Sequence, residues 1–318
     1  MFLSRMAISW LWMWCLCGLF WQCAYGNVFN PAQDLSKAED LVSLGEWSLA
    51  RRYLEPAIYS PYIARQQRSR FYYVRAYSFF EEHLYVSAKK DFQRALEFDT
   101  ANQNALYYLG RIHFLGKGVV EDMELGISFF RQAAVLGHLD ARFYVGYGYI
   151  NGRGIEKNEV EGLDILVALS KEGHTISMLH LADYYRENSE SNDSMSSSVV
   201  VDLYLRALSM GSADAALALG FMYKTGELVT QNTSLSYEYF AQAAALGNHE
   251  ANIHLAYAHM TGSGVNQSYS LAKFYYLQAA EHDLEGGFLG LGYLYEFGLG
   301  LPINKAVAQS FYELASKG

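Results

Sequence analysis

From residue 105 onward, the chain repeats one pattern of small, aliphatic and aromatic residues at a nearly constant interval. The plainest copy begins Ala215-Ala-Leu-Ala-Leu-Gly220-Phe-Met-Tyr223 and ends Tyr239-Phe240-Ala-Gln-Ala243-Ala-Ala-Leu-Gly247. We call the small residue at the position of Gly220 the central residue of a copy. Steps of 36, 36, 38, 36 and 36 residues separate the central residues Gly110, Gly146, Ala182, Gly220, Ala256 and Gly292. Six tandem copies indicate stacked structural repeats, each contacting only its neighbours.

The pattern within each copy predicts two helices. A small residue lies five positions before the central residue and an aliphatic one directly before it, which lines one face of a first helix. A second helix follows, with aromatic residues to fill space and alanines for close packing, as in Phe129-Phe130-Arg-Gln-Ala133-Ala134. Gly-x-Gly pairs are expected to end the first helix in a left-handed conformation. These pairs are Gly116 and Gly118, Gly152 and Gly154, Gly262 and Gly264, and Gly298 and Gly300.

Two weaker copies precede these six. Ala76 lies 34 residues before Gly110, and aromatic and alanine residues around it fall where helix-packing positions are expected. The whole pattern resembles the Sel-1-like repeat, a relative of the tetratricopeptide repeat with units of about 36 residues. The resemblance implies an all-α fold, a right-handed α/α superhelical solenoid. We expect two tetratricopeptide-like repeats over 27–103 and six Sel-1-like repeats over 104–139, 140–175, 176–213, 214–249, 250–285 and 286–318.

Two departures from the repeat pattern stand out. Asp283 occupies a position where the other repeats have a glycine between them. The third Sel-1-like copy lacks the Gly-x-Gly pair and carries a polar insertion, Asn188 to Ser198, which we expect to form a mobile surface loop.

The N-terminus has the pattern of a signal peptide over residues 1–26. Arg5 precedes an uncharged run from Met6 to Phe20, and Ala24 and Gly26 suit cleavage after Gly26. The alternative is an uncleaved anchor, because Met6 to Ala24 is long enough to cross a bilayer. All three cysteines, Cys15, Cys17 and Cys23, lie in this segment, so a cleaved chain would have no thiol chemistry.

The composition argues against a nucleic-acid partner. The formal charge is -9, and the lysines and arginines form no cluster that would attract phosphates. The nine histidines show no metal-ligand spacing, and nothing in the sequence predicts a cofactor or a metal site. After signal cleavage we expect no membrane span.

A hydrolase is the enzyme class that the sequence allows us to test. Some families built on this repeat are linked to β-lactam binding, and Ser87-Ala-Lys-Lys90 and Ser270-Leu-Ala-Lys273 fit a Ser-x-x-Lys motif. Lys224-Thr-Gly226 imitates a second motif of those enzymes. Each also has a structural explanation, either as part of a second helix or as the end of a first helix. We therefore predict no catalytic residues and a chain that is not an enzyme.

The positions two before and one after the central residue share one face of the first helix. In solenoids of this class that face lines the concave side, and tyrosine is favoured at interfaces. An alternative is that several of these rings pack against the neighbouring repeat. The predicted partner-binding groove consists of Tyr108, Tyr144, Tyr147, His180, Phe221, His254, Tyr257 and Tyr293.

The resemblance implies an assembly platform for other proteins. We expect an exported, non-enzymatic scaffold in the periplasm that serves envelope or secretion components, such as polysaccharide-secretion or motor-type machinery. One alternative is a cell-wall or β-lactam binding or hydrolysing protein, and another is an adaptor for quality control in the endoplasmic reticulum. The last repeat has no polar closing helix, so self-association through it is a further expectation.

Overall fold

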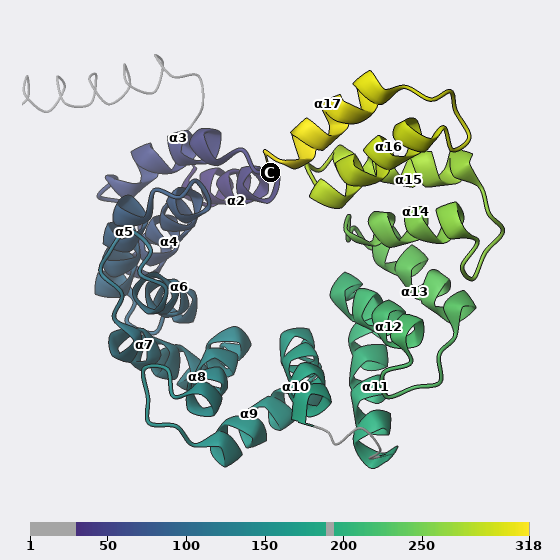
Figure 1. The fold of residues 1–318 in the computed structure, drawn as a ribbon. Coiled ribbons are helices and arrows are strands. Elements are labelled where there is room, and N and C mark those ends of the chain that lie inside the picture. The colour runs from purple at the N-terminus through teal and green to yellow at the C-terminus, as the bar shows by residue number, and fades with distance from the viewer. Residues whose placement is uncertain (1–29, 189–193, 318) are drawn as a thin grey trace, which may run out of the picture. The chain divides into compact units, whose positions relative to one another are not determined.

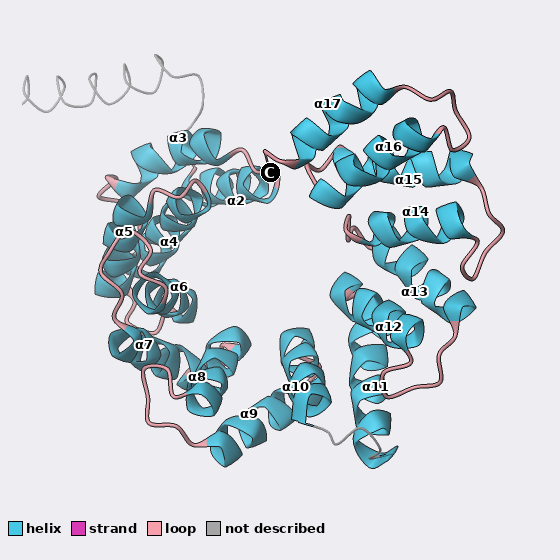
Figure 2. Ribbon diagram, viewed as in Figure 1, coloured by secondary structure: helices cyan, strands magenta, loops and turns pink. Residues whose placement is uncertain are grey.

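The computed structural model describes residues 30–188 and 194–317. The described residues form helices and connecting loops without any strand (Figure 2), which confirms the predicted all-α repeat fold. Their helices are α2 (Pro31–Ser43), α3 (Trp47–Ile58), α4 (Arg65–Glu81), α5 (Tyr85–Phe98), α6 (Gln103–Phe114), α7 (Met123–Val135), α8 (Leu139–Asn151), α9 (Glu159–Lys171), α10 (Thr175–Asn188), α11 (Ser194–Ser209), α12 (Ala213–Thr225), α13 (Thr233–Ala245), α14 (Ala251–Thr261), α15 (Tyr269–Ala280), α16 (Glu285–Phe297) and α17 (Lys305–Ala315). The predicted signal segment and its three cysteines lie outside the described residues.

The chain divides into two compact parts, residues 1–162 and 163–318, with the division inside α9. We call them the N-terminal part and the C-terminal part and describe each by itself. Within each part, consecutive helices pack in pairs, such as α4 with α5, α6 with α7 and α12 with α13 (Figure 1). First helices also contact first helices of the next repeat, as α6 contacts α8 and α14 contacts α16.

The polar insertion of the third copy is shorter than predicted. Asn188 still belongs to α10, and α11 begins at Ser194, so the expectation of a loop over the whole insertion is wrong at both ends. The buried side chain of Val200 anchors the first turns of α11. Residues 189–193 lie outside the described residues.

Five of the second helices, α7, α9, α13, α15 and α17, share one kind of start. A short polar side chain directly before the helix accepts a hydrogen bond from a backbone N–H in its first turn, which satisfies a donor that the helix leaves free. Asp122 Oδ1 accepts from Leu125 N at 2.9 Å, and Asn232 Oδ1 accepts from Leu235 N at 3.0 Å. Asn158, Ser268 and Asn304 occupy the same position in their repeats.

The Gly-x-Gly pairs end first helices, as predicted. Gly152, Gly262 and Gly298 follow the last helical residue with φ between 67° and 79°. The second glycine of a pair also lets two backbones approach. A Cβ at Gly154 would overlap the carbonyl group of Met123 on α7, and one at Gly264 would overlap that of Thr233 on α13. The pair therefore both ends a helix and sets its contact with the preceding repeat.

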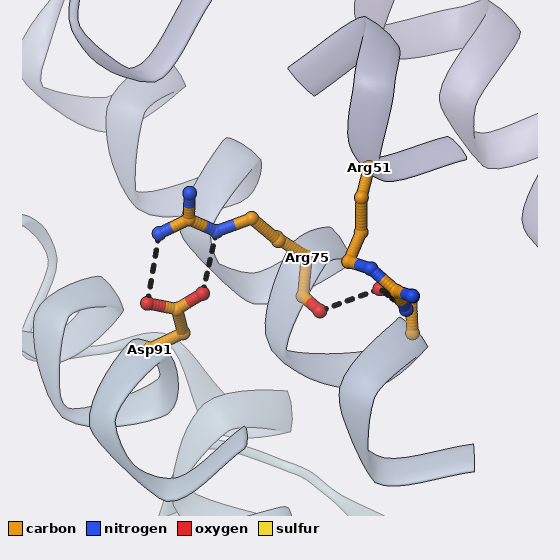
Figure 3. Close-up of polar contacts among 4 residues, drawn as sticks. Arg51, Arg75 and Asp91 are labelled. Carbon is orange, nitrogen blue, oxygen red and sulfur yellow. Dashed lines mark hydrogen bonds and ion pairs between the residues drawn. The ribbon is translucent and has the colours of Figure 1, made fainter. Parts of the chain in front are cut away.

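A buried polar network joins α3, α4 and α5 (Figure 3). Arg75 donates to Asp91 through two hydrogen bonds of 2.6 and 3.0 Å, and both side chains are almost fully buried. Arg51 donates to Ser78 Oγ at 3.3 Å and pairs with Glu82 at 2.6 Å. Ser78 Oγ in turn donates to the carbonyl oxygen of Arg75 at 2.7 Å. These charges are paired inside the fold, so they cross-link the first two helix pairs.

Candidate partner-binding surface

In several repeats, an aromatic ring of the second helix packs first against the central glycine of the same repeat. A Cβ added to Gly110 would lie 2.6 Å from the ring of Phe130, and one added to Gly220 would lie 2.6 Å from the ring of Phe240. Real Cβ atoms do not approach this closely, so the glycine is what allows α6 and α7, or α12 and α13, to pack.

The same ring then stacks on the first helix of the next repeat. We call this contact between a second helix and the following first helix a seam. At three seams the stacking residue is the one two positions before the central residue. Ring centroids are 5.3 Å apart for Phe92 and Tyr108, 4.5 Å for Phe130 and Tyr144, and 4.7 Å for Phe240 and His254, with planes 5°, 10° and 26° apart.

Where the first helix offers no ring, the second helix carries a tyrosine instead of a phenylalanine. Gly290 faces Tyr276, whose ring a Cβ at Gly290 would overlap. Ala218 holds the corresponding position after Tyr204, which is fully buried and donates its hydroxyl hydrogen to Asp183 Oδ1 at 2.6 Å. The two sides of a seam are therefore matched in size.

Three predicted groove residues, Tyr108, Tyr144 and His254, thus lie half-buried in seams. Burial lowers the pKa of His254 to about 4, and the nearby ammonium of Lys224 adds to the shift. Burial also raises the pKa of the Tyr108 phenol, helped by Tyr73. Both side chains therefore stay neutral near pH 7.

Two other predicted residues are exposed on neighbouring first helices of the C-terminal part. Tyr257 on α14 is 47% exposed and Tyr293 on α16 is 44% exposed. The ring of Phe297 lies beside that of Tyr293, with centroids 4.6 Å apart and planes 45° apart, and is 54% exposed. Lys224 Nζ on α12 lies 5.5 Å from the ring centre of Tyr257 and 5.9 Å from that of Phe221. Phe221 itself is half-buried and packs edge-on against the seam rings of Phe240 and His254, with centroids 5.4 and 4.6 Å apart. We call Lys224, Tyr257, Tyr293 and Phe297 the aromatic surface of the C-terminal part.

Tyr147 and His180 complete the predicted set. Tyr147 is half-buried on α8, with its ring centre 6.1 Å from that of Phe143. His180 on α10 is exposed, yet enough protein surrounds its imidazole to lower its pKa by desolvation.

The sequence pattern missed rings that lie one helical turn away from the two chosen positions. In the N-terminal part, Tyr108 also contacts Tyr73, Tyr77 and Phe80, with ring centres 5.0 to 6.4 Å apart. In the C-terminal part, Phe297 lies four residues after Tyr293. Residues three or four apart share a helix face, so the same periodicity could have found them.

The hydrolase motifs do not assemble a recognisable site. Ser87 is exposed on α5, and the Ser270 hydroxyl faces Ser268 Oγ at 3.0 Å. The ammonium of Lys273 lies over the ring of Tyr295, 5.4 Å from its centre. Within residues 30–188 and 194–317, no three histidine, cysteine or carboxylate side chains are grouped to hold a metal ion. Nor is any helix of those residues long and apolar enough to cross a membrane.

Comparison with known families gives one clear match. The family model described as Sel1 repeat matches residues 103–138, 139–173, 213–248, 249–284 and 289–318, together more than half of the chain. Helices α10 and α11 lie between the second and third matched stretches.

Individual relatives are more distant. Chitin synthase regulatory factor 1 of Schizosaccharomyces pombe is 28% identical over 153 residues, which are 45% of this chain and 34% of that protein. The chain therefore spans about a third of the length of this relative. A Sel1 repeat protein of Oxalobacter formigenes has a similar structure, with a TM-score of 0.63, 21% identity, and coverage of 74% of this chain and 98% of that one.

A protective antigen of uropathogenic Escherichia coli that displays an SLR fold is similar as well. Its TM-score is 0.59 at 24% identity, and the match covers 92% of this chain and 64% of the antigen. At such identities the two solved structures support the fold alone.

Proposed function

The chain belongs to the Sel1 repeat family, and we propose that it is an exported, non-enzymatic scaffold that holds partner proteins on the first-helix face of its repeats. Membership confirms the resemblance read from the repeat pattern. Sel1 repeats mediate protein–protein interactions, so a scaffold is the function class that the family favours.

One observation carries the proposal. Tyr257, Tyr293 and Phe297 expose large apolar surfaces on the neighbouring first helices α14 and α16. Exposed aromatic residues that lie side by side are a common mark of a binding surface, because a partner gains most from burying them.

We place the partner in the cell envelope. The apolar segment Met6 to Phe20 after Arg5 supports export, and a polysaccharide-synthesising or polysaccharide-secreting complex is our choice of partner. The relative from fission yeast, by its name a regulator of chitin synthase, supports a partner that makes a polysaccharide. For the location, we propose the periplasm.

The test is capture of partners from the protein's own cells. The tagged full-length chain is crosslinked mildly, purified and analysed by mass spectrometry, which also gives the mass of the mature chain. We expect a stoichiometric envelope protein with the wild type and its loss when Tyr257, Tyr293 and Phe297 are all replaced by alanine.

The matched control is Phe274→Ala. Phe274 is 51% exposed but lies on the second helix α15, so this variant should keep the partner. Equal capture by the triple variant and the wild type, at unchanged melting temperature, would refute the proposed surface. A chain that emerges alone and has lost its first 26 residues would favour cell-wall or small-ligand binding instead.

A further inference from the structure

Arg111 on α6 lies in a cradle of aromatic rings in the N-terminal part. Its guanidinium carbon is 4.9 Å from the ring centre of Phe80, 5.7 Å from that of Tyr107 and 5.6 Å from that of Tyr108. The side chain is half-buried, and its Nε atom is buried without a hydrogen-bond partner. Such rings attract a cation through their faces and satisfy few of its five N–H donors; the Tyr107 hydroxyl also interacts with the guanidinium, which lowers the pKa of that phenol against the larger, opposite effect of burial.

A second cation flanks the same ring. Lys117 Nζ lies 5.3 Å from the ring centre of Phe80 and 5.2 Å from that of Tyr85. Within residues 30–188 and 194–317, neither Arg111 nor Lys117 forms an ion pair with a carboxylate. The half-buried Arg51 and Arg75 of the same part contrast with them, because each is paired with a carboxylate at 2.6 Å.

We propose that Arg111 and Lys117 bind side-chain carboxylates of an acidic segment of a partner protein. This inference rests on the proposed scaffold function. It names the chemical groups that form one contact between the scaffold and its partner. A planar guanidinium donates to both oxygens of a carboxylate, and the aromatic cradle would hold it in place for that contact. The tyrosine rings around it provide apolar surface for the rest of the segment.

A carboxylate suits the surroundings better than a phosphate does. The charges of Glu81 and Asp140 are close enough to raise the pKa of Tyr77 and Tyr107, after the larger effect of burial on each. These carboxylates offset part of the positive charge of Arg111 and Lys117, which leaves less attraction for a doubly charged phosphate than two isolated cations would offer. A net charge of -9 also opposes a long polyanion such as a nucleic acid.

The proposal has a consequence for stability that a structural role would not have. A half-buried cation without an anionic partner loses hydration on folding and regains only part of it from the rings. Replacing Arg111 by methionine, which keeps an unbranched apolar stem but lacks the guanidinium, should therefore leave the melting temperature unchanged or raise it. A marked fall would show that Arg111 holds the fold together.

The binding test uses the full-length chain and a fluorescein-labelled peptide in which glutamate alternates with serine. Fluorescence anisotropy should show binding that weakens as salt is added. We expect the affinity to fall at least tenfold in Arg111→Met, less in Arg111→Lys and Lys117→Met, and not at all in Arg94→Met, whose arginine is exposed on α5 and pairs with Glu97.

Four results would overturn the inference. They are no binding of the glutamate peptide, equal binding by Arg111→Met, equal binding of the matching glutamine peptide, and stronger competition by inorganic phosphate than by free glutamate. None of these depends on the aromatic surface of the C-terminal part. An outcome in which the triple variant loses partner capture while the peptide test fails would support the scaffold function and refute only the contact through Arg111 and Lys117.

Discussion

The ring of Tyr144 lies parallel to that of Phe130, with centroids 4.5 Å apart and planes 10° apart. Phe130 is fully buried, and Tyr144 covers it from the first helix of the next repeat. A residue chosen from the sequence as part of a groove therefore also contributes to packing between repeats.

We predict that Tyr144→Ala lowers the free energy of unfolding by about 2 to 4 kcal/mol, because it opens a cavity beside Phe130 and removes the stack. Tyr257→Ala, at an exposed ring, should change it by less than about 0.5 kcal/mol. Urea denaturation followed by circular dichroism measures both. Similar losses for the two variants would contradict the division into seam and surface residues.

Stability should also depend on pH through His254. Its pKa is about 4 in the folded protein and about 6.5 when unfolded, so the unfolded state binds more protons between these values. His254 therefore makes its full contribution to the free energy of unfolding above pH 6.5. This contribution falls by about 2 kcal/mol in total as the pH is lowered to 4.

The measurement is urea denaturation of the wild type and of His254→Phe across this range. Phenylalanine can stack on Phe240 without titrating, so the variant should lose less stability on acidification than the wild type does. Parallel pH profiles for the two proteins would show that His254 is not the group responsible.

The backbone of Asp283 is strained, and a substitution by glycine should relieve the strain. Its φ is 55°, whereas the glycines at this position in other repeats, such as Gly247 with φ of 95°, adopt positive φ without a steric penalty. Asp283 is exposed, so Asp283→Gly should raise the free energy of unfolding by about 0.5 to 1 kcal/mol. Thermal melting would detect this as an increase in melting temperature.

Two controls separate strain from charge. Gly247→Asp, the reverse change in an equivalent turn, should destabilise the protein. Asp283→Ala removes the carboxylate but keeps the Cβ, so it should bring no gain. An equal gain from Asp283→Ala would mean that charge rather than backbone conformation limits stability here.

The buried pair of Arg75 and Asp91 should matter far more than an exposed pair. Asp91→Ala leaves a buried cation without its partner and should cost about 3 to 5 kcal/mol. Replacing both residues together, Arg75→Met with Asp91→Leu, should cost clearly less. Glu97→Ala removes an exposed partner of Arg94 and should change stability by less than about 1 kcal/mol. An additive double variant would contradict the argument.

Periodic features were predictable from the sequence. The small residue at Gly110, the aromatic residue at Phe130 and the Gly-x-Gly pairs recur at fixed offsets, and a recurring offset has one structural meaning in every repeat. Two helices per repeat and the helix ends follow from that. The start of α11 did not, because burial of Val200 outweighs the polar composition before it.

Whether each aromatic side chain packs in a seam or lies on the surface was harder to predict. Tyr144 and Tyr147 differ by one turn on the same helix, and the pattern alone treats both as groove residues. Whether a ring stacks depends on what the preceding second helix presents, as Phe240 does for His254. Arg111 lies one position after Gly110, on the predicted groove face, but its significance lies in an absent carboxylate partner, which only the three-dimensional arrangement reveals.

The size matching at the seams limits how such a chain can change during evolution. Loss of the repeat over 250–285 would place α16 directly after α13, and Phe240 would then face Gly290 in place of His254. Glycine has no side chain, so the space beside Phe240 that the His254 ring now fills would be empty. Repeats of equal length are therefore not interchangeable here, and duplication or deletion of one repeat would call for a compensating substitution in its neighbour.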